Sequence, residues 1–309
     1  YVRMCNINSL LVTGASEISR FEHTIGVLHL TKTWCRAKKV PESIAKEVVA
    51  AAVLHDMQTG PFGHSMQYVL EDNELDASFV HEDLTHGWRS SYHQQMLANA
   101  SFAGRPFGAQ SYLGKSWDTV AKIIRGEGKY GPLIAGTMDL DNIDNVGGLA
   151  FHVGVANKED AGIAEELARE IVPVNGGISL PDSAISTVER WQKIRHDLYR
   201  LLLLDWAEFS AKAMLTRAIE LAADYEIVGA DSWIRTDYEF LEHLERKAIG
   251  EYQGVRDLVR RLRHGDLYVP LFLGASISVE VYSLLSEIKF KHGFEASLAK
   301  LAGVKGVSI

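Results

Sequence analysis

The chain has 309 residues, of which 47% are hydrophobic, and a formal net charge of −8 from 32 basic and 40 acidic side chains. This size and composition allow a substantial buried core, in one large domain or two smaller ones. The acidic balance and the lack of a lysine- or arginine-rich tract argue against a protein that binds the nucleic-acid backbone.

Helical periodicity dominates the first part of the chain. Residues 22–36 predict a helix with Ile25, Leu28 and His29 on one stripe and with Val27, Leu30 and Trp34 close to it. Pro41 and Glu42 begin the next predicted helix, which runs through "SIAKEVVAAAVLHD" and is apolar on nearly all sides, as a central buried helix is. Further helices are predicted over 64–72, 116–126 and 159–170.

The second half of the chain contains the longest helical pattern and the few strand signals. Residues 172–183 contain several helix breakers and predict either a hairpin or a linker. A near-continuous helical pattern follows over 187–225. Strands are predicted over 176–180 and 267–279, the second at a sheet edge because of Pro270. We expect a mainly α fold, with a helical domain over 1–225 and a small C-terminal extension of helices and strands over 226–309 packed on it as one unit.

Histidines are concentrated early in the chain, with four of the twelve at positions 55, 64, 81 and 86. His55 and Asp56 are adjacent, so their side chains lie about 100° apart on a straight helix. They can still meet at one ion where a helix ends. An imidazole and a carboxylate suit Zn, Mn, Fe or Ni better than Ca. Chance is the alternative, because the same dipeptide recurs at His196-Asp197.

Three segments, which follow one another along the chain, make a functional role for His55 and Asp56 more credible than chance. They are "SRFEHTIGVLHL", "LHDMQTGPFGHS" and "MDLDNIDNVGGLAFHVG". Together they resemble the three signatures of the HD-domain phosphohydrolases, most closely those of the deoxynucleoside triphosphate triphosphohydrolase (dGTPase-like) branch. The resemblance is dense over residues 14–155 and fainter over 188–222. It implies an HD-domain helical bundle.

The resemblance also implies a metal site. Its ligands would be His23, His55, Asp56 and Asp141. Two imidazoles and two carboxylates leave open positions on an ion, which could be Mn, Fe, Ni, Zn or Mg. Arg20 matches a family arginine that contacts phosphate, and an arginine fork suits that task. A surface salt bridge is the alternative for Arg20.

The resemblance places the acid–base chemistry on His64, which matches the family's catalytic histidine. The carboxylate expected three residues later is absent, since position 67 is glutamine. Glutamine can orient an imidazole but cannot stabilise an imidazolium as a carboxylate does. His81 and Glu82 are similar to a second family histidine and its neighbour. We expect that pair to be able to supply the missing function.

The substrate-binding positions depart from the family pattern. Thr59 stands where relatives often have histidine or asparagine, Asn142 where they have arginine or lysine, and Asn145 where they have tyrosine. An acidic residue of the relatives is replaced by Leu149. Tyr199 lies near a family tyrosine that borders the pocket. The pattern predicts an intact metal site with a weakened grip on triphosphate.

The sequence thus predicts a metal-dependent phosphohydrolase of a nucleotide-like substrate, with a (deoxy)nucleoside triphosphate as the leading candidate. Alternatives are a phosphomonoesterase or phosphodiesterase on the same scaffold, and a nucleotide-sensing protein with little turnover. The expected partner is a small molecule, with no nucleic-acid duplex and no membrane, and the relatives' assemblies suggest a homo-oligomer. Two cysteines, Cys5 and Cys35, form no disulfide framework, and no secretory leader is visible, so we expect a cytoplasmic protein. Because the chain begins at Tyr1, we expect an N-terminal piece to precede it.

Overall fold

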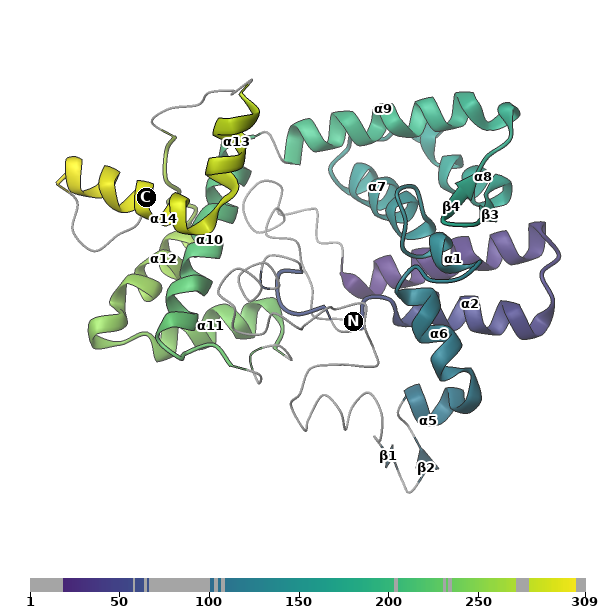
Figure 1. Ribbon diagram of the computed structural model, residues 1–309, viewed down its shortest axis with the longest axis horizontal. Helices are drawn as coiled ribbons and strands as arrows, with labels where there is room; N and C mark the ends of the chain where they lie inside the picture. The colour runs from purple at the N-terminus through teal and green to yellow at the C-terminus, as the bar shows by residue number, and fades with distance from the viewer. Residues whose placement is uncertain are drawn as a thin grey trace.

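A computed structural model describes residues 19–57, 59–63, 66, 101–102, 105–106, 109–202, 205–229, 232, 235–270 and 278–303. The fold is mainly α, as predicted (Figure 1). The helices are α1 (Arg20–Ala37), α2 (Glu42–Leu54), α5 (Ala109–Leu113), α6 (Trp117–Ile124), α7 (Leu140–His152), α8 (Ile163–Glu170), α9 (Ile185–Leu202), α10 (Trp206–Asp224), α11 (Asp237–Lys247), α12 (Gln253–His264), α13 (Val279–Ser286) and α14 (Ile288–Leu301). Short 3-10 turns are η3 (Gly114–Ser116), η4 (Gly131–Leu133), η5 (Lys158–Asp160), η6 (Asp182–Ala184) and η8 (Gly250–Tyr252).

The first hydrophobic core surrounds α1, which packs on α2, α7 and α8. The N-terminus of α1 is capped by Ser19, whose hydroxyl accepts a hydrogen bond from the backbone N–H of Glu22 at 3.1 Å. The other end of the helix is fixed by Trp34, whose indole Nε1 donates to the carbonyl oxygen of Ile171 at 3.1 Å. Both ends of α1 are therefore fixed, and with them the position of His23 between those ends.

The buried face of α1 differs from the predicted stripe. Val27, Leu30 and Trp34 are buried, whereas Ile25 and His29 are exposed. His29 Nε2 instead lies 2.9 Å from a carboxylate oxygen of the partly exposed residue Glu165 on α8. The prediction followed the apolar residues alone. The buried face of α1 also contains the polar residue His23, and it is therefore rotated about the helix axis from the predicted stripe.

Two antiparallel two-stranded sheets lie within the described residues, β1 (Ser101–Phe102) with β2 (Arg105–Pro106) and β3 (Val172–Val174) with β4 (Gly177–Ser179). The β3–β4 pair confirms the hairpin that was one of two predictions for 172–183. Its turn contains Gly176 at φ 77°, a backbone conformation that favours glycine. The strand predicted over 267–279 is not seen at residues 267–270, and residues 271–277 lie outside the described part.

The segment over 267–270 packs on helices and pairs with no strand among the described residues. The Ser210 hydroxyl of α10 donates to the Tyr268 carbonyl oxygen at 2.5 Å, and the Arg261 guanidinium of α12 lies 4.4 Å from the centre of the Tyr268 ring. Tyr268 in this segment is thus held by contacts with α10 and α12.

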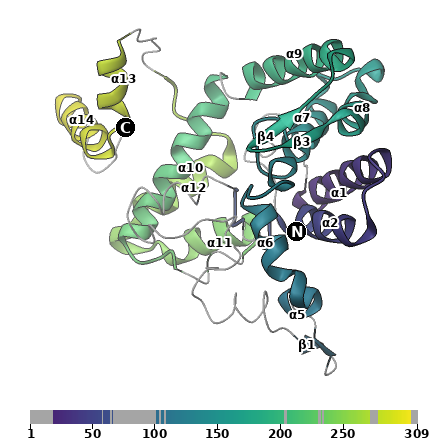
Figure 2. The same cartoon turned by 45° about the vertical axis from the view of Figure 1, so that its right-hand side comes forward.

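A second hydrophobic core is formed by α10, α11 and α12, which lie to one side of the first core in both views (Figures 1 and 2). Phe62 and Met66 contribute side chains to this core. The backbone N–H of Phe62 also donates to Asp237 Oδ1 at the start of α11, at 2.8 Å. The loop that follows His55 and Asp56 therefore reaches from the first core to the second.

No helix in the described portion combines the length and the apolar character that a membrane span requires.

Candidate metal centre

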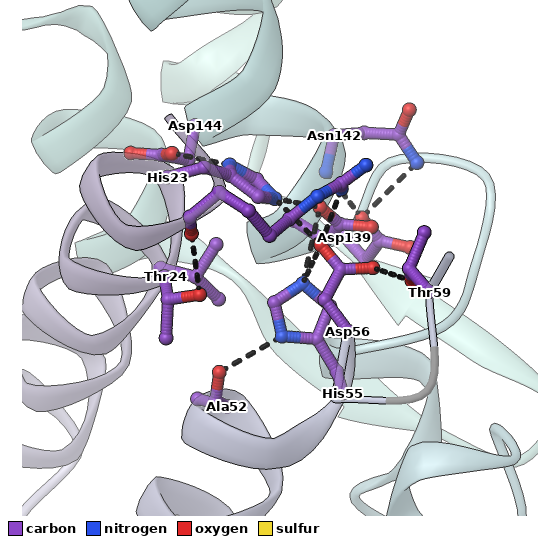
Figure 3. Close-up of polar contacts among 12 residues, drawn as sticks. His23, Thr24, Ala52, His55, Asp56, Thr59, Asp139, Asn142 and Asp144 are labelled. Atoms are coloured by element: carbon purple, nitrogen blue, oxygen red, sulfur yellow. Dashed lines mark hydrogen bonds and ion pairs between the residues drawn. The ribbon is translucent and has the colours of Figure 1, made fainter. Parts of the chain in front are cut away.

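Three elements bring the predicted ligands together. His23 lies in the second turn of α1, His55 is the C-cap of α2 with Asp56 next to it, and Asp141 lies in the first turn of α7. The end of α2 at Leu54 lets the adjacent His55 and Asp56 converge, as the sequence suggested. Figure 3 shows the two imidazoles and the Asp56 carboxylate pointing toward one another.

The donor atoms of this cluster lie close together. Atoms of His23, His55 and Asp56 all lie within 4.8 Å of one another, an arrangement that could hold a metal ion. Asp141 Oδ1 lies 2.7 Å from His23 Nε2 and 3.5 Å from His55 Nε2. Ligand atoms about 2.1 Å from one ion lie about 3 Å apart when they subtend a right angle. The observed spacings are of this size.

The tautomers of both imidazoles are fixed by contacts at Nδ1. His23 Nδ1 lies 2.7 Å from Asp144 Oδ2, and His55 Nδ1 lies 2.9 Å from the carbonyl oxygen of Ala52. Because both partners accept hydrogen bonds, each Nδ1 carries the proton, and each Nε2 presents its lone pair to the cluster. Both Nε2 atoms are buried, and although Asp141 Oδ1 lies near each of them, neither makes a well-aligned hydrogen bond among the described residues. A carboxylate or carbonyl behind a metal-binding imidazole is the usual arrangement.

The electrostatics of the cluster favour an added positive charge. Burial opposes protonation of His23, but Asp141, Asp144 and Asp56 outweigh it and raise the His23 pKa to about 9. Burial likewise lowers the pKa of His55, and Asp56 and Asp141 reverse this, so that it lies well above its usual value. The cluster therefore attracts a proton when no other cation is available, and a divalent ion satisfies the same carboxylates.

Arg20 and Thr59 both contact Asp56. The Arg20 guanidinium forms an ion pair with Asp56 Oδ2, and the Thr59 hydroxyl donates to Asp56 Oδ1 at 3.0 Å. Burial raises the pKa of Asp56, but the Arg20 and His55 charges hold it well below its usual range. Asp56 is therefore an anion fixed in orientation from both of its oxygens.

The start of α7 is organised by Asp139, which the sequence did not single out as functional. Its side chain accepts hydrogen bonds from the backbone N–H groups of Asn142 at 2.6 Å and Gly136 at 2.5 Å. The Asn142 side-chain amide also donates to Asp139, at 3.1 Å. Burial and the nearby Asp141 charge raise the Asp139 pKa to about 6. This N-cap fixes the first turn of α7 and with it Asp141.

The remaining predicted residues are placed as follows. Asn145 is exposed on α7. The Tyr199 ring on α9 is covered by the Arg195 guanidinium, 4.3 Å from its centre. The predicted catalytic residues His64, His81 and Glu82 lie outside the described residues.

Residues 20–130 match the family model of the HD domain. This stretch contains His23, His55 and Asp56, whereas Asp141 lies beyond its end. An uncharacterized Bacillus subtilis protein, YwfO, is 27% identical over 214 residues, which are 67% of this chain and 45% of that protein. The chain therefore spans less than half the length of this relative.

Two solved structures share the fold. A phosphohydrolase from Bacteroides thetaiotaomicron superposes with a TM-score of 0.69 at 15% sequence identity. The superposition covers 98% of this chain and 77% of the phosphohydrolase chain. A hypothetical protein from Aquifex aeolicus superposes with a TM-score of 0.62 at 17% sequence identity. That superposition covers 85% of this chain and 67% of the Aquifex aeolicus chain. At these identities the likeness shows the fold alone.

Proposed function

We propose that this protein is a metal-dependent phosphohydrolase that cleaves a phosphoester of a nucleotide-like substrate, with a (deoxy)nucleoside triphosphate as the leading candidate. The observation that carries the proposal is the pair of buried imidazole Nε2 atoms, which lack hydrogen-bond partners among the described residues and face two carboxylates. The HD-domain match and the fold shared with a phosphohydrolase support it.

In this proposal His23, His55, Asp56 and Asp141 hold one divalent ion. A bound ion of this kind supplies Lewis acidity toward a phosphoryl oxygen and acidifies water. Arg20 lies beside Asp56 at the edge of the cluster, where its guanidinium can also pair with a phosphate. Thr59 keeps the Asp56 carboxylate oriented. His23, His55 and Asp56 are buried, whereas Asp141 is partly exposed. In this proposal the substrate therefore approaches the ion from the side of Asp141.

The acid–base step is assigned to His64 on the basis of the family resemblance, with His81 and Glu82 as the supporting pair. In the sequence His64 directly follows Gly63, the last residue of the loop over 59–63, which Asp237 anchors through the Phe62 N–H. With glutamine at position 67, the imidazolium form of His64 has to be stabilised by another carboxylate, and Glu82 is the proposed one.

The substrate preference is proposed from Asn142, Asn145, Leu149 and Tyr199. The Asn142 amide is occupied by Asp139, and it carries no charge with which to grip phosphate. Losing one charged contact to phosphate lowers affinity by roughly tenfold to a hundredfold. We therefore expect ordinary deoxynucleoside triphosphates to be weak substrates, with relaxed discrimination of the sugar because Leu149 replaces an acidic residue of the relatives.

The test begins with metal content. His55→Ala and Asp56→Ala should each lower metal affinity at least as far as the loss of an outer-shell partner does, roughly tenfold to a hundredfold. The matched control is His29→Ala, which removes an exposed imidazole from α1 and should leave metal content unchanged. Full metal retention in both ligand variants would show that the site is elsewhere.

The second stage measures release of phosphate and tripolyphosphate from ribo- and deoxynucleotides and from simple phosphomonoesters and diesters. Turnover that is lost together with the metal supports the phosphohydrolase. Efficient hydrolysis of one deoxynucleoside triphosphate with strong rejection of its ribo counterpart would contradict the expected weak triphosphate binding and relaxed sugar discrimination. Nucleotide binding without turnover in the metal-loaded protein would instead identify a sensor.

A further inference from the structure

A second polar site lies between α11 and α12, outside the metal cluster. These consecutive helices are joined through η8, pack on each other and belong to the second hydrophobic core. A pocket of about 400 Å³ opens between them. It is lined by Glu242, Glu245, Arg246, Ile249, Arg256 and Arg263. Its walls are therefore almost entirely charged, and arginine predominates.

Both carboxylates of the pocket are already engaged. Glu242 pairs with Arg246 at 2.6 Å. Glu245 is shared by two guanidinium groups, with Arg260 Nε and Arg263 Nη1 each 2.9 Å from one of its oxygens. The two carboxylates of the lining are thus paired with three arginines, and neither pairs with Arg256.

Arg256 is the cation that remains. It has no ion pair or hydrogen bond within the described structure, and its Nε is buried without a hydrogen-bond partner. A buried donor that has lost water and gained no acceptor is unfavourable, and a ligand oxygen would relieve it. The planar guanidinium fork matches the paired oxygens of a phosphate or carboxylate group. A phosphate carries more negative charge, which suits a lining with three arginines.

We propose that this pocket binds a phosphate group, held by Arg256 with Arg246 and Arg263 at its rim. The rim side chains are accessible, since Arg246 is 77% and Arg263 41% exposed. Glu242 is 49% exposed and can turn toward solvent when an anion replaces it against Arg246. The site does not depend on the metal centre, because its residues come from two other helices. The phosphate could be inorganic or part of a nucleotide.

The test is calorimetric binding of inorganic phosphate, tripolyphosphate and ATP to the full chain treated with a chelator. Arg256→Ala should weaken binding roughly tenfold to a hundredfold, and Arg256→Lys, which keeps the charge but loses the fork, should fall between. Glu242→Gln should tighten binding because it removes a competing carboxylate. Arg169→Ala, an exposed arginine on α8, is the matched control and should bind like the wild type.

Stronger binding of ATP than of phosphate and tripolyphosphate would identify a nucleotide site, and equal binding of all three a site for the phosphate group alone. Thermal unfolding of Arg256→Lys shows whether the fold is kept. The proposal fails if the wild-type chain shows no saturable binding at millimolar ligand. It also fails if folded Arg256→Ala and Arg256→Lys both bind as tightly as the wild type.

Discussion

At the scale of single residues, the orientation of His23 depends on a glycine one turn further along α1. A Cβ built on Gly26 would lie 1.9 Å from Asp144 Oδ1 and 2.5 Å from its Cγ. The Asp144 carboxylate therefore occupies the space that any side chain at position 26 would fill. From that position it holds His23 Nδ1. Burial and the Asp141 charge raise the pKa of Asp144 despite this hydrogen bond.

Gly26→Ala should therefore displace Asp144 and release His23. Alanine in a helix normally stabilises by about 0.5–1 kcal/mol relative to glycine, but overpacking costs about 1–3 kcal/mol. We expect Gly26→Ala to lower the free energy of unfolding in urea and to weaken metal binding. The matched control is Gly147→Ala on α7, whose added Cβ meets only Ala164 Cβ at 4.0 Å and should stabilise.

A double-variant comparison sharpens this prediction. In an Asp144→Ala background the space beside Gly26 is empty, so Gly26→Ala should have little further effect on metal affinity. Equal losses of affinity from Gly26→Ala with and without Asp144 would show that the two residues act independently.

The sequence singled out the proposed metal ligands but not the residues that orient them. The family resemblance pointed to His23, His55, Asp56 and Asp141, and these four lie close together in the structure, while their binding of a metal stays a prediction. Asp144 and Asp139 were not singled out, because a carboxylate that orients an imidazole or caps a helix has no spacing signature of its own. Their roles depend on α1 and α7 being adjacent, which is a property of the packing.

At the scale of elements, the loop over 59–63 is held between the two cores. Phe62 adopts φ 56°, a left-handed conformation that is uncommon for a bulky residue. Its ring packs 6.5 Å from that of Phe240, and its N–H donates to the buried Asp237. The loop geometry is thus determined by α11 as much as by its own sequence.

Asp237→Ala should loosen this loop. We expect a loss of about 1–3 kcal/mol in the free energy of unfolding, because the Phe62 N–H loses a buried acceptor. Turnover should fall more than metal content does, since His64 follows the loop and the ligands precede it. Glu239→Ala is the control, because it removes the other capping contact of α11 but none to the loop. Unchanged turnover in the Asp237 variant would refute the anchoring role.

Helix positions were largely predictable and one boundary was not. The predicted helices over 22–36, 116–126 and 159–170 correspond to α1, α6 and α8. The pattern over 187–225 was interpreted as near-continuous, yet α9 ends at Leu202 and α10 begins at Trp206. Four consecutive leucines at 201–204 precede Asp205 in the sequence, so apolar periodicity could not reveal the interruption at that residue. Asp205, with extended backbone, is the N-cap of the second helix.

At the scale of the whole molecule, α10 belongs with the helices that follow it. It packs on α12 and contributes to the second hydrophobic core, while the domain boundary expected at residue 225 stays a prediction. Its first turn buries Glu208 completely, and both carboxylate oxygens lack a hydrogen-bond partner among the described residues. Burial raises the Glu208 pKa to about 7, with Lys212 opposing and Asp205 reinforcing the shift.

This carboxyl should make stability depend on pH. Between its usual value of 4.5 and about 7, Glu208 is protonated in the folded chain and ionised in the unfolded one. Its contribution to stability is therefore fully present below pH 4.5 and declines as the pH rises to 7, by about 3 kcal/mol at most. Glu208→Gln should be more stable than the wild type at pH 8 and similar at pH 4.5. A difference that does not vary with pH would contradict this.

The separation of the metal-site elements along the chain bears on the order of assembly. His23 and Asp144 are 121 residues apart in sequence, whereas α1 and α2 are neighbours. Loop-closure entropy makes the distant contact the slower one to form. During synthesis from the N-terminus, α1 and α2 can pair while α7 is still inside the ribosome. The nascent chain would then expose two imidazoles and a carboxylate before the helix that completes and orients them has emerged.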